Sequence, residues 1–313
     1  MHDSPDSESQ DSKPQTPTSL NLEAQDAKPQ DAKPPAHAAV GEPLTHRQIG
    51  VLLTSVLVIS ICGLIYELII GTLSSYLLGS SVTHFSITIG AFLFAMGVGS
   101  YLSRFVRKRI ISAFVLVEII TGLTGGIAAV LLFGVFAFTS YFYFYVAMFS
   151  AILIIGGCMG LEIPLLTRIV STQGTLRDNL AHVFSFDYLG ALIGSLLFPL
   201  VLLRFFGLMG TAFATGVLNL VIAILVILAF RKPRRTMKSL LTLACVGIAI
   251  LVVGFFSSSR ISRFYDKHLY SDRIVYTEQT HYQKIVMTRY REDLRLFLDG
   301  SLQFSLADEY RYH

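Results

Sequence analysis

Long apolar runs constrain this chain more than any other feature of its sequence. Between Ile49 and Phe256 the residues fall into apolar runs that approach the roughly 20 residues an α-helix needs to cross a bilayer. The whole chain of 313 residues is 53% hydrophobic and only 15% charged, with a mean hydropathy of +0.60, as is typical of integral membrane proteins. We predict about seven transmembrane helices, at residues 48–70, 85–103, 110–134, 142–165, 183–203, 208–230 and 239–256.

Basic residues lie in alternate loops of this arrangement. The loops after the second, fourth and sixth predicted helices contain Arg104, Arg107, Lys108, Arg109, Arg168, Arg177, Arg231, Lys232, Arg234, Arg235 and Lys238. The loops on the other side offer only Arg204. The positive-inside rule therefore places the N-terminus in the cytoplasm of a multi-pass protein of the cell membrane. With seven crossings, the segment after Phe256 would emerge on the outer side, whereas a re-entrant run or a different count would place it in the cytoplasm.

The regions on either side of the helices differ in character. Residues 1–43 are rich in Ser, Asp, Gln, Lys and Pro and contain three near copies of one pentad, at residues 10–14, 25–29 and 30–34. So few large apolar side chains cannot offset the entropy of ordering the segment, and we predict a disordered tail. No short apolar core with a cleavage pattern precedes Ile49, so a signal peptide is not expected. The predicted domains are the tail at 1–43, a membrane domain at 44–256 and a small domain at 257–313.

The C-terminal segment from Ile274 onward is the only part with strand character. Apolar and polar residues alternate on both sides of Arg291, Glu292 and Asp293, and Asp299 with Gly300 follows the second run. Asp-Gly is a strong signal for a two-residue hairpin turn. The predicted fold is thus an α-helical membrane bundle followed by a small antiparallel β-meander.

An ordered set of residues in this segment resembles the spermidine synthase family. The set comprises Tyr282 and Gln283, then Leu298, Asp299 and Gly300, then Gln303, Asp308, Glu309, Tyr312 and His313. The membrane region is similar to the membrane-anchored branch of the same family at residues 63–67, 92–100, 188–194 and 206–207. In that branch a multi-helix domain precedes the aminopropyltransferase domain.

The resemblance implies a polyamine aminopropyltransferase that uses decarboxylated S-adenosylmethionine as co-substrate and putrescine or a related amine as acceptor, with no other cofactor. It implies that Gln283 contacts the nucleoside of the donor, and that Gln303, Tyr312 and His313 line the polyamine site. The family's glycine-rich strand-loop-helix and its catalytic aspartate come later than the part matched here. We therefore expect this chain to be an N-terminal portion without the Rossmann-like catalytic domain, to contain no catalytic residue, and to be inactive by itself.

Acidic residues within the apolar runs suggest a second kind of site. Glu118, Glu162 and Asp187 are predicted in the cytoplasmic halves of three helices, with no lysine or arginine deep enough to pair with them. Acids in the hydrocarbon region often mark an ion or substrate path, so these three could together hold a cation. Alternatively, the carboxyl groups reach the membrane interface or hydrogen-bond to neighbouring hydroxyls.

Small residues recur at spacings that let helices approach closely, at Gly97, Gly99 and Ser100, Gly156 and Gly160, and Gly190 and Gly194. We interpret them as packing faces. Cys62, Cys158 and Cys245 all lie inside apolar runs and the histidines are scattered, so neither a disulfide framework nor a metal site is expected.

Two classes of function are compatible with these features. The first is the membrane-anchored aminopropyltransferase; the second is a transporter or sensor for polyamines or other small cations. The expected partners are a polyamine and the lipid bilayer, and a homo-oligomer is compatible with the sequence. The basic residues do not form one soluble face, so a nucleic-acid partner is not expected.

Overall fold

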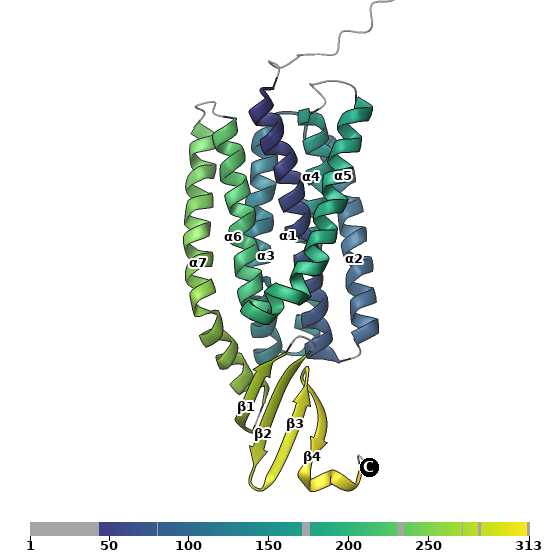
Figure 1. The fold of residues 1–313 in the computed structure, drawn as a ribbon, viewed down its shortest axis with the longest axis vertical. Coiled ribbons are helices and arrows are strands. Elements are labelled where there is room, and N and C mark those ends of the chain that lie inside the picture. The colour runs from purple at the N-terminus through teal and green to yellow at the C-terminus, as the bar shows by residue number, and fades with distance from the viewer. Residues whose placement is uncertain are drawn as a thin grey trace, which may run out of the picture. The chain divides into compact units, whose positions relative to one another are not determined.

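A computed structural model describes residues 44–79, 81–170, 176–230, 235–270, 272–280 and 283–311. The predicted disordered tail lies outside these residues. Helices form a bundle that leads into a small sheet (Figure 1). The helices are α1 His46–Leu78, α2 Ser81–Leu102, α3 Ile110–Phe138, α4 Tyr141–Val170, α5 Leu176–Leu197, α6 Leu203–Ala229 and α7 Arg235–Leu269.

Six helical segments of the described residues are long and apolar enough to span a membrane, rather than the seven predicted. The difference arises in the fifth segment, Leu180–Ala229, which contains most of α5, a π-helical turn at Phe198–Leu202, and α6. Gly207 interrupts this segment with φ 63° and ψ −177°, a backbone conformation almost confined to glycine. The spans predicted at 183–203 and 208–230 both fall within it, on opposite sides of this break.

The direction of the chain reverses between α5 and α6. Gln48 at the start of α1 donates a hydrogen bond to the Ala229 carbonyl at the end of α6, at 3.1 Å. Further along α1, Cys62 lies 3.8 Å from the Thr215 carbonyl, so α1 and α6 are antiparallel. Helix α5 runs parallel to α1, since Gly190 lies against Leu57 and Gly194 against Ile61, and it is therefore antiparallel to α6 (Figure 1). The connection around Gly207 therefore lies at the end of the bundle nearest the sheet.

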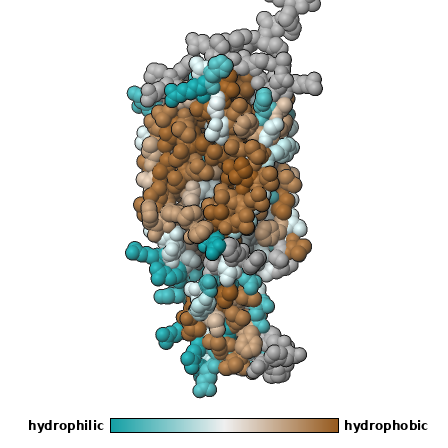
Figure 2. Space-filling view, in the orientation of Figure 1, coloured by the Kyte–Doolittle hydropathy of each residue, from teal (hydrophilic) through white to brown (hydrophobic). Residues whose placement is uncertain are grey.

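Helix α1 is the central helix of the bundle. It begins in a capping box, in which the Gln48 backbone N–H donates to the Thr45 hydroxyl while the Gln48 side chain accepts from the Thr45 N–H. It then packs against α2, α4, α5 and α6. On the face shown in Figure 2, apolar side chains cover the middle of the bundle and hydrophilic residues lie toward its two ends; many large apolar side chains of the helices are exposed. This surface is what a bilayer-spanning bundle presents to lipid.

Glycines of all three predicted packing faces lie at close helix contacts, but one predicted residue, Gly97, does not. A Cβ atom at Gly160 would lie 2.0 Å from the Met96 carbonyl oxygen, and the α1 backbone lies similarly close to Gly190 and Gly194. Gly99 faces Gly157 of α4. Nothing lies within 4 Å of a Cβ at Gly97, so including that residue in the face was wrong.

The C-terminal strands form the predicted antiparallel meander, in the order β1-β2-β3-β4. The strands are β1 Arg273–Gln279, β2 Lys284–Tyr290, β3 Asp293–Leu298 and β4 Ser301–Ser305, followed by a 3-10 helix at Leu306–Arg311. Both predicted turns are present, with positive φ at Arg291, Asp299 and Gly300. Two consecutive residues with positive φ are the mark of a type I′ hairpin turn, which explains the Asp-Gly sequence.

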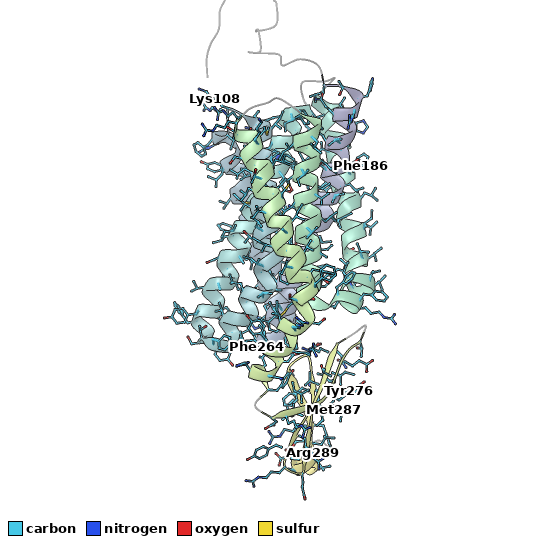
Figure 3. The ribbon with its side chains drawn as sticks, turned by 90° about the vertical axis from the view of Figure 1, so that its left-hand side faces the viewer. Lys108, Phe186, Phe264, Tyr276, Met287 and Arg289 are labelled. Atoms are coloured by element: carbon cyan, nitrogen blue, oxygen red, sulfur yellow. The ribbon has the colours of Figure 1, made fainter. Side chains whose placement is uncertain are left out.

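Helix α7 continues to Leu269, past the predicted end at residue 256. Hydropathy falls after Phe256, but aromatic contacts support further turns, since Tyr265 packs on Phe133 with ring centroids 6.1 Å apart. The predicted domain boundary near residue 257 thus falls inside a helix. Figure 3 shows Phe264 at the sheet end of the bundle and Lys108 at the opposite end.

Candidate functional site

A cavity of about 630 Å³ lies between the end of the bundle and the first strands of the sheet. We call it the interface chamber. Its wall includes the end of α1 at Tyr76, the α5–α6 connection at Arg204, the end of α7 at Asp266, and the sheet region at Gln283 and Lys284, with Phe85 of α2 and Phe133 of α3 beside them. It therefore exists only because segments far apart in the sequence meet here.

Lys284 connects the sheet to the bundle at this chamber. Its ammonium Nζ lies 2.5 Å from Asp266 Oδ1 of α7, and both side chains are largely buried, with 16% and 8% exposed. The same nitrogen lies 5.7 Å from the centroid of the Tyr76 ring of α1. Tyr76 in turn shares a hydrogen bond with the Tyr270 hydroxyl, at 3.0 Å. One lysine thus contacts two helix ends from the first position of β2.

The Asp299–Gly300 turn supports the same contact. The Lys284 backbone N–H donates to Asp299 Oδ1 at 2.8 Å, and the Asp299 N–H donates to the Lys284 carbonyl at 3.0 Å. A Cβ at Gly300 would lie 2.8 Å from the Tyr76 carbonyl oxygen, so only glycine lets the turn approach α1 this closely. Partial burial raises the pKa of the Asp299 carboxyl, while the N–H and the charge of Lys284 act to lower it.

The chamber wall is suited to a polar, charged ligand. Carboxyl groups come from Asp266, Glu278 and Asp299, and guanidinium groups from Arg204 and Arg263. Hydroxyl groups of serines on α7 add donors and acceptors. Such a wall can hold a flexible amine by ion pairs and hydrogen bonds. No group of three or more His, Cys, Asp or Glu placed to bind a metal occurs among the described residues.

The structure places the residues predicted from the resemblance in different surroundings. Gln283 lines the interface chamber, and its backbone is fixed by a turn in which its N–H donates to the Thr280 hydroxyl at 3.1 Å. Gln303 is exposed on β4 and does not line the chamber. Tyr312 and His313 lie outside the described residues, as does Tyr282.

Two of the three predicted intramembrane acids come together. Glu118 of α3 and Glu162 of α4 are buried in the bundle core, and their carboxyl groups lie close enough to interact directly. Asp187 of α5 is only partly buried, and its backbone carbonyl accepts a hydrogen bond from the Ser60 hydroxyl at 2.6 Å. Asp187 lies near enough to Glu162 for their charges to interact, so its place in a cation site with the two buried glutamates stays a prediction.

Sequence reasoning missed three residues that the structure makes prominent. Lys284 and Asp266 form the buried ion pair, and nothing in their local sequence links them. Asn219 donates to Glu118 from α6. It is a single amide in a long apolar run, and that isolation was a signal that could have been used.

Comparison with known proteins shows what the chain is similar to. It is 43% identical over 264 residues to a polyamine aminopropyltransferase of Leptospira interrogans, covering 84% of this chain and 52% of that protein. It is 42% identical over 287 residues to polyamine aminopropyltransferase 1 of Ralstonia nicotianae, covering 90% and 54%. With a polyamine aminopropyltransferase of Mycobacterium tuberculosis it shares 34% over 273 residues, covering 84% and 52%.

The chain is thus homologous to polyamine aminopropyltransferases and spans about half the length of the relatives it matches. No protein-family model matches the chain. No solved structure matches it either.

Proposed function

We propose that this chain is the N-terminal, membrane-embedded part of a polyamine aminopropyltransferase. The observation that carries the proposal is the homology, about 40% identity over about 85% of the chain. The reaction would transfer an aminopropyl group from decarboxylated S-adenosylmethionine to putrescine or a related amine and release methylthioadenosine. Such a reaction requires two reactants held in line and an amine nitrogen kept deprotonated.

In this proposal the interface chamber forms one wall of the substrate site. Gln283 would contact the nucleoside of the donor, and Glu278 and Asp299 would favour the cationic nitrogens of the amine. Gln303, Tyr312 and His313 would line the polyamine channel, as the resemblance implies. The residues that bind the donor's sulfonium and deprotonate the amine would lie in the half of the relatives that this chain does not span.

The proposal predicts a clear difference between two forms of the protein. The protein as made in its own cells, purified from membranes, should form methylthioadenosine from decarboxylated S-adenosylmethionine and putrescine. The 313-residue chain alone should show no formation above the uncatalysed rate. Chromatographic quantification of methylthioadenosine measures both. Turnover by the 313-residue chain would show that it contains a complete site, contrary to our expectation.

We further propose that the N-terminus faces the cytoplasm, because the basic residues gather at the end of the bundle where α1 begins. The sheet and chamber would then face the outer side. A cysteine in place of Ser301 at the exposed β3–β4 turn should react with a membrane-impermeant maleimide in intact cells, whereas one in place of Lys108 should react only after lysis. The reverse pattern would contradict this topology and place the chamber on the cytoplasmic side.

A second candidate function, transport or sensing of small cations, is favoured by the buried Glu118 and Glu162. Flux of labelled putrescine into vesicles that contain the chain tests it. Flux that is unchanged when Glu118 and Glu162 are both replaced by glutamine would exclude a path through these carboxyl groups.

A further inference from the structure

Four helices bring polar side chains together in the middle of the bundle. Glu118 comes from α3, Glu162 from α4, Asn219 from α6 and Tyr66 from α1, and none of the four is more than 3% exposed. We call them the core cluster. Among the described residues, the ion pairs involve neither glutamate. The cluster lies in the apolar part of the bundle, away from the interface chamber.

Hydrogen bonds fix part of this cluster. Asn219 Nδ2 donates to Glu118 Oε2 at 2.9 Å and to the Glu118 backbone carbonyl at 3.0 Å, and these two bonds use both hydrogens of the amide. The amide oxygen of Asn219 is thereby directed away from Glu118. The Glu162 carboxyl group interacts with that of Glu118.

Close helix packing makes room for the cluster. A Cβ at Gly125 of α3 would lie 2.4 Å from the Tyr66 ring, and one at Gly122 would lie 3.2 Å from Asn219 Cβ. Small residues one turn apart on α3 therefore seat the Tyr66 ring and the Asn219 side chain. Because these positions are set by backbone packing, the polar groups are held in place rather than free to reach solvent.

Each member of the cluster has a buried oxygen without a hydrogen-bond partner. These oxygens are Glu118 Oε1, Glu162 Oε1, Asn219 Oδ1 and the Tyr66 hydroxyl. An unpaired buried polar group is unfavourable, and two charged carboxylates side by side in a low-dielectric interior are more so unless a proton or another cation joins them. The tyrosine hydroxyl can donate one hydrogen, which still leaves acceptor oxygens unsatisfied.

Carboxylate, amide carbonyl and hydroxyl oxygens are the groups that hard cations and ammonium groups prefer. We propose that the core cluster is a binding site for one small monovalent cation, either an alkali metal ion or the ammonium group of an amine. Glu118 and Glu162 supply the negative charge, and Asn219 and Tyr66 supply neutral ligands. This proposal does not depend on the aminopropyltransferase function.

A cleft offers a route toward this site. It has a volume of about 550 Å³ and lies along α2, α4 and α5, where Met159, Gly160 and Ile163 line it on either side of Glu162. The Met159 side chain also packs against Gly63, next to Cys62 in the core. Movement of this one flexible side chain would shorten the path from the cleft to the cluster.

Thermal unfolding of the full 313-residue chain in lipid nanodiscs tests the proposal. The temperature of unfolding is measured at pH 8 and constant ionic strength while N-methylglucamine is replaced by sodium, potassium or methylammonium. A cation that binds only the folded state should raise it by about 5 °C or more at 100 times the Kd. A rise in unfolding temperature that saturates with sodium or potassium identifies a metal ion as the ligand, and one that saturates with methylammonium identifies an ammonium group.

Variants locate the effect. Glu118→Gln and Glu162→Gln should abolish the saturable shift, whereas Glu67→Gln, the matched loss of a partly buried carboxyl group on α1, should retain it. Other titratable groups near the pair are Tyr66, Cys62, Cys158 and Asp187. The unmodified protein gives a second readout, since the same cation should protect Glu118 and Glu162 from dicyclohexylcarbodiimide, followed by mass spectrometry. No shift and no protection by any cation would overturn the proposal and leave a pair that holds only protons.

Discussion

Replacing Gly99 by alanine is expected to separate α2 from α4 and to destabilise the bundle severely. A Cβ at this position would lie 1.9 Å from the Gly157 carbonyl oxygen and 3.0 Å from Gly157 Cα. The obstacle is backbone, so no rotamer change can relieve it. Overpacking in a core typically costs about 1–3 kcal/mol, and here two helices must move apart. The unfolding temperature and the monodispersity of purified protein measure the effect.

Gly97→Ala is the matched control for this prediction. Gly97 lies two residues earlier on the same helix, and no atom lies within 4 Å of the position that a Cβ would occupy there. Alanine favours a helix by about 1 kcal/mol over glycine, so this variant should be at least as stable as the original protein. Equal unfolding temperatures for Gly99→Ala and the original protein would show that α2 and α4 do not pack as described.

Replacing Asp266 by alanine is expected to detach the sheet from the bundle. The change leaves the Lys284 ammonium group, 16% exposed, without its ion-pair partner. Removing one partner of a buried pair typically costs about 3–5 kcal/mol. Because the pair joins α7 to β2, the loss should appear as faster hydrogen exchange in the strands, with little change in the helices.

Two further variants separate this effect from simple loss of charge. Asp272→Ala removes one carboxylate from Arg295, whose side chain is 34% exposed and keeps Asp293, so it should cost less than the loss of the only ion-pair partner of Lys284 among the described residues. The double change Asp266→Leu with Lys284→Met should recover much of the lost protection, since apolar residues often replace a buried pair at no cost. Unchanged exchange in Asp266→Ala would contradict the proposed role of the pair.

The helices and the meander could be predicted from the sequence because each is encoded locally. Apolar length identifies the membrane helices, and the Asp299–Gly300 turn identifies the hairpin between β3 and β4. The reversal between α5 and α6 was harder to define, because helical hydrogen bonding continues through most of Leu180–Ala229. Only the positive φ at Gly207 shows where the helix breaks.

The sites were less predictable because they depend on which face each residue occupies. Gly97 and Gly99 are two residues apart, about 200° around a helix, and the sequence does not say which one faces α4. Glu118 and Glu162 were predicted as a site, but their partner Asn219 comes from α6, 101 residues after Glu118. The ion pair between Asp266 and Lys284 depends on how the sheet docks, which no local pattern specifies.

The central claim is that the interface chamber forms part of an aminopropyltransferase site. The most direct test is the kcat/KM for decarboxylated S-adenosylmethionine, measured by methylthioadenosine formation with the natural protein and with Gln283→Ala. Loss of one neutral hydrogen bond to the substrate predicts a fall of about 2- to 10-fold. Arg289 lies further along β2 and away from the chamber (Figure 3). Arg289→Ala should therefore leave the kcat/KM unchanged. No methylthioadenosine from the natural protein, or equal values for Gln283→Ala and the natural protein, would contradict the claim.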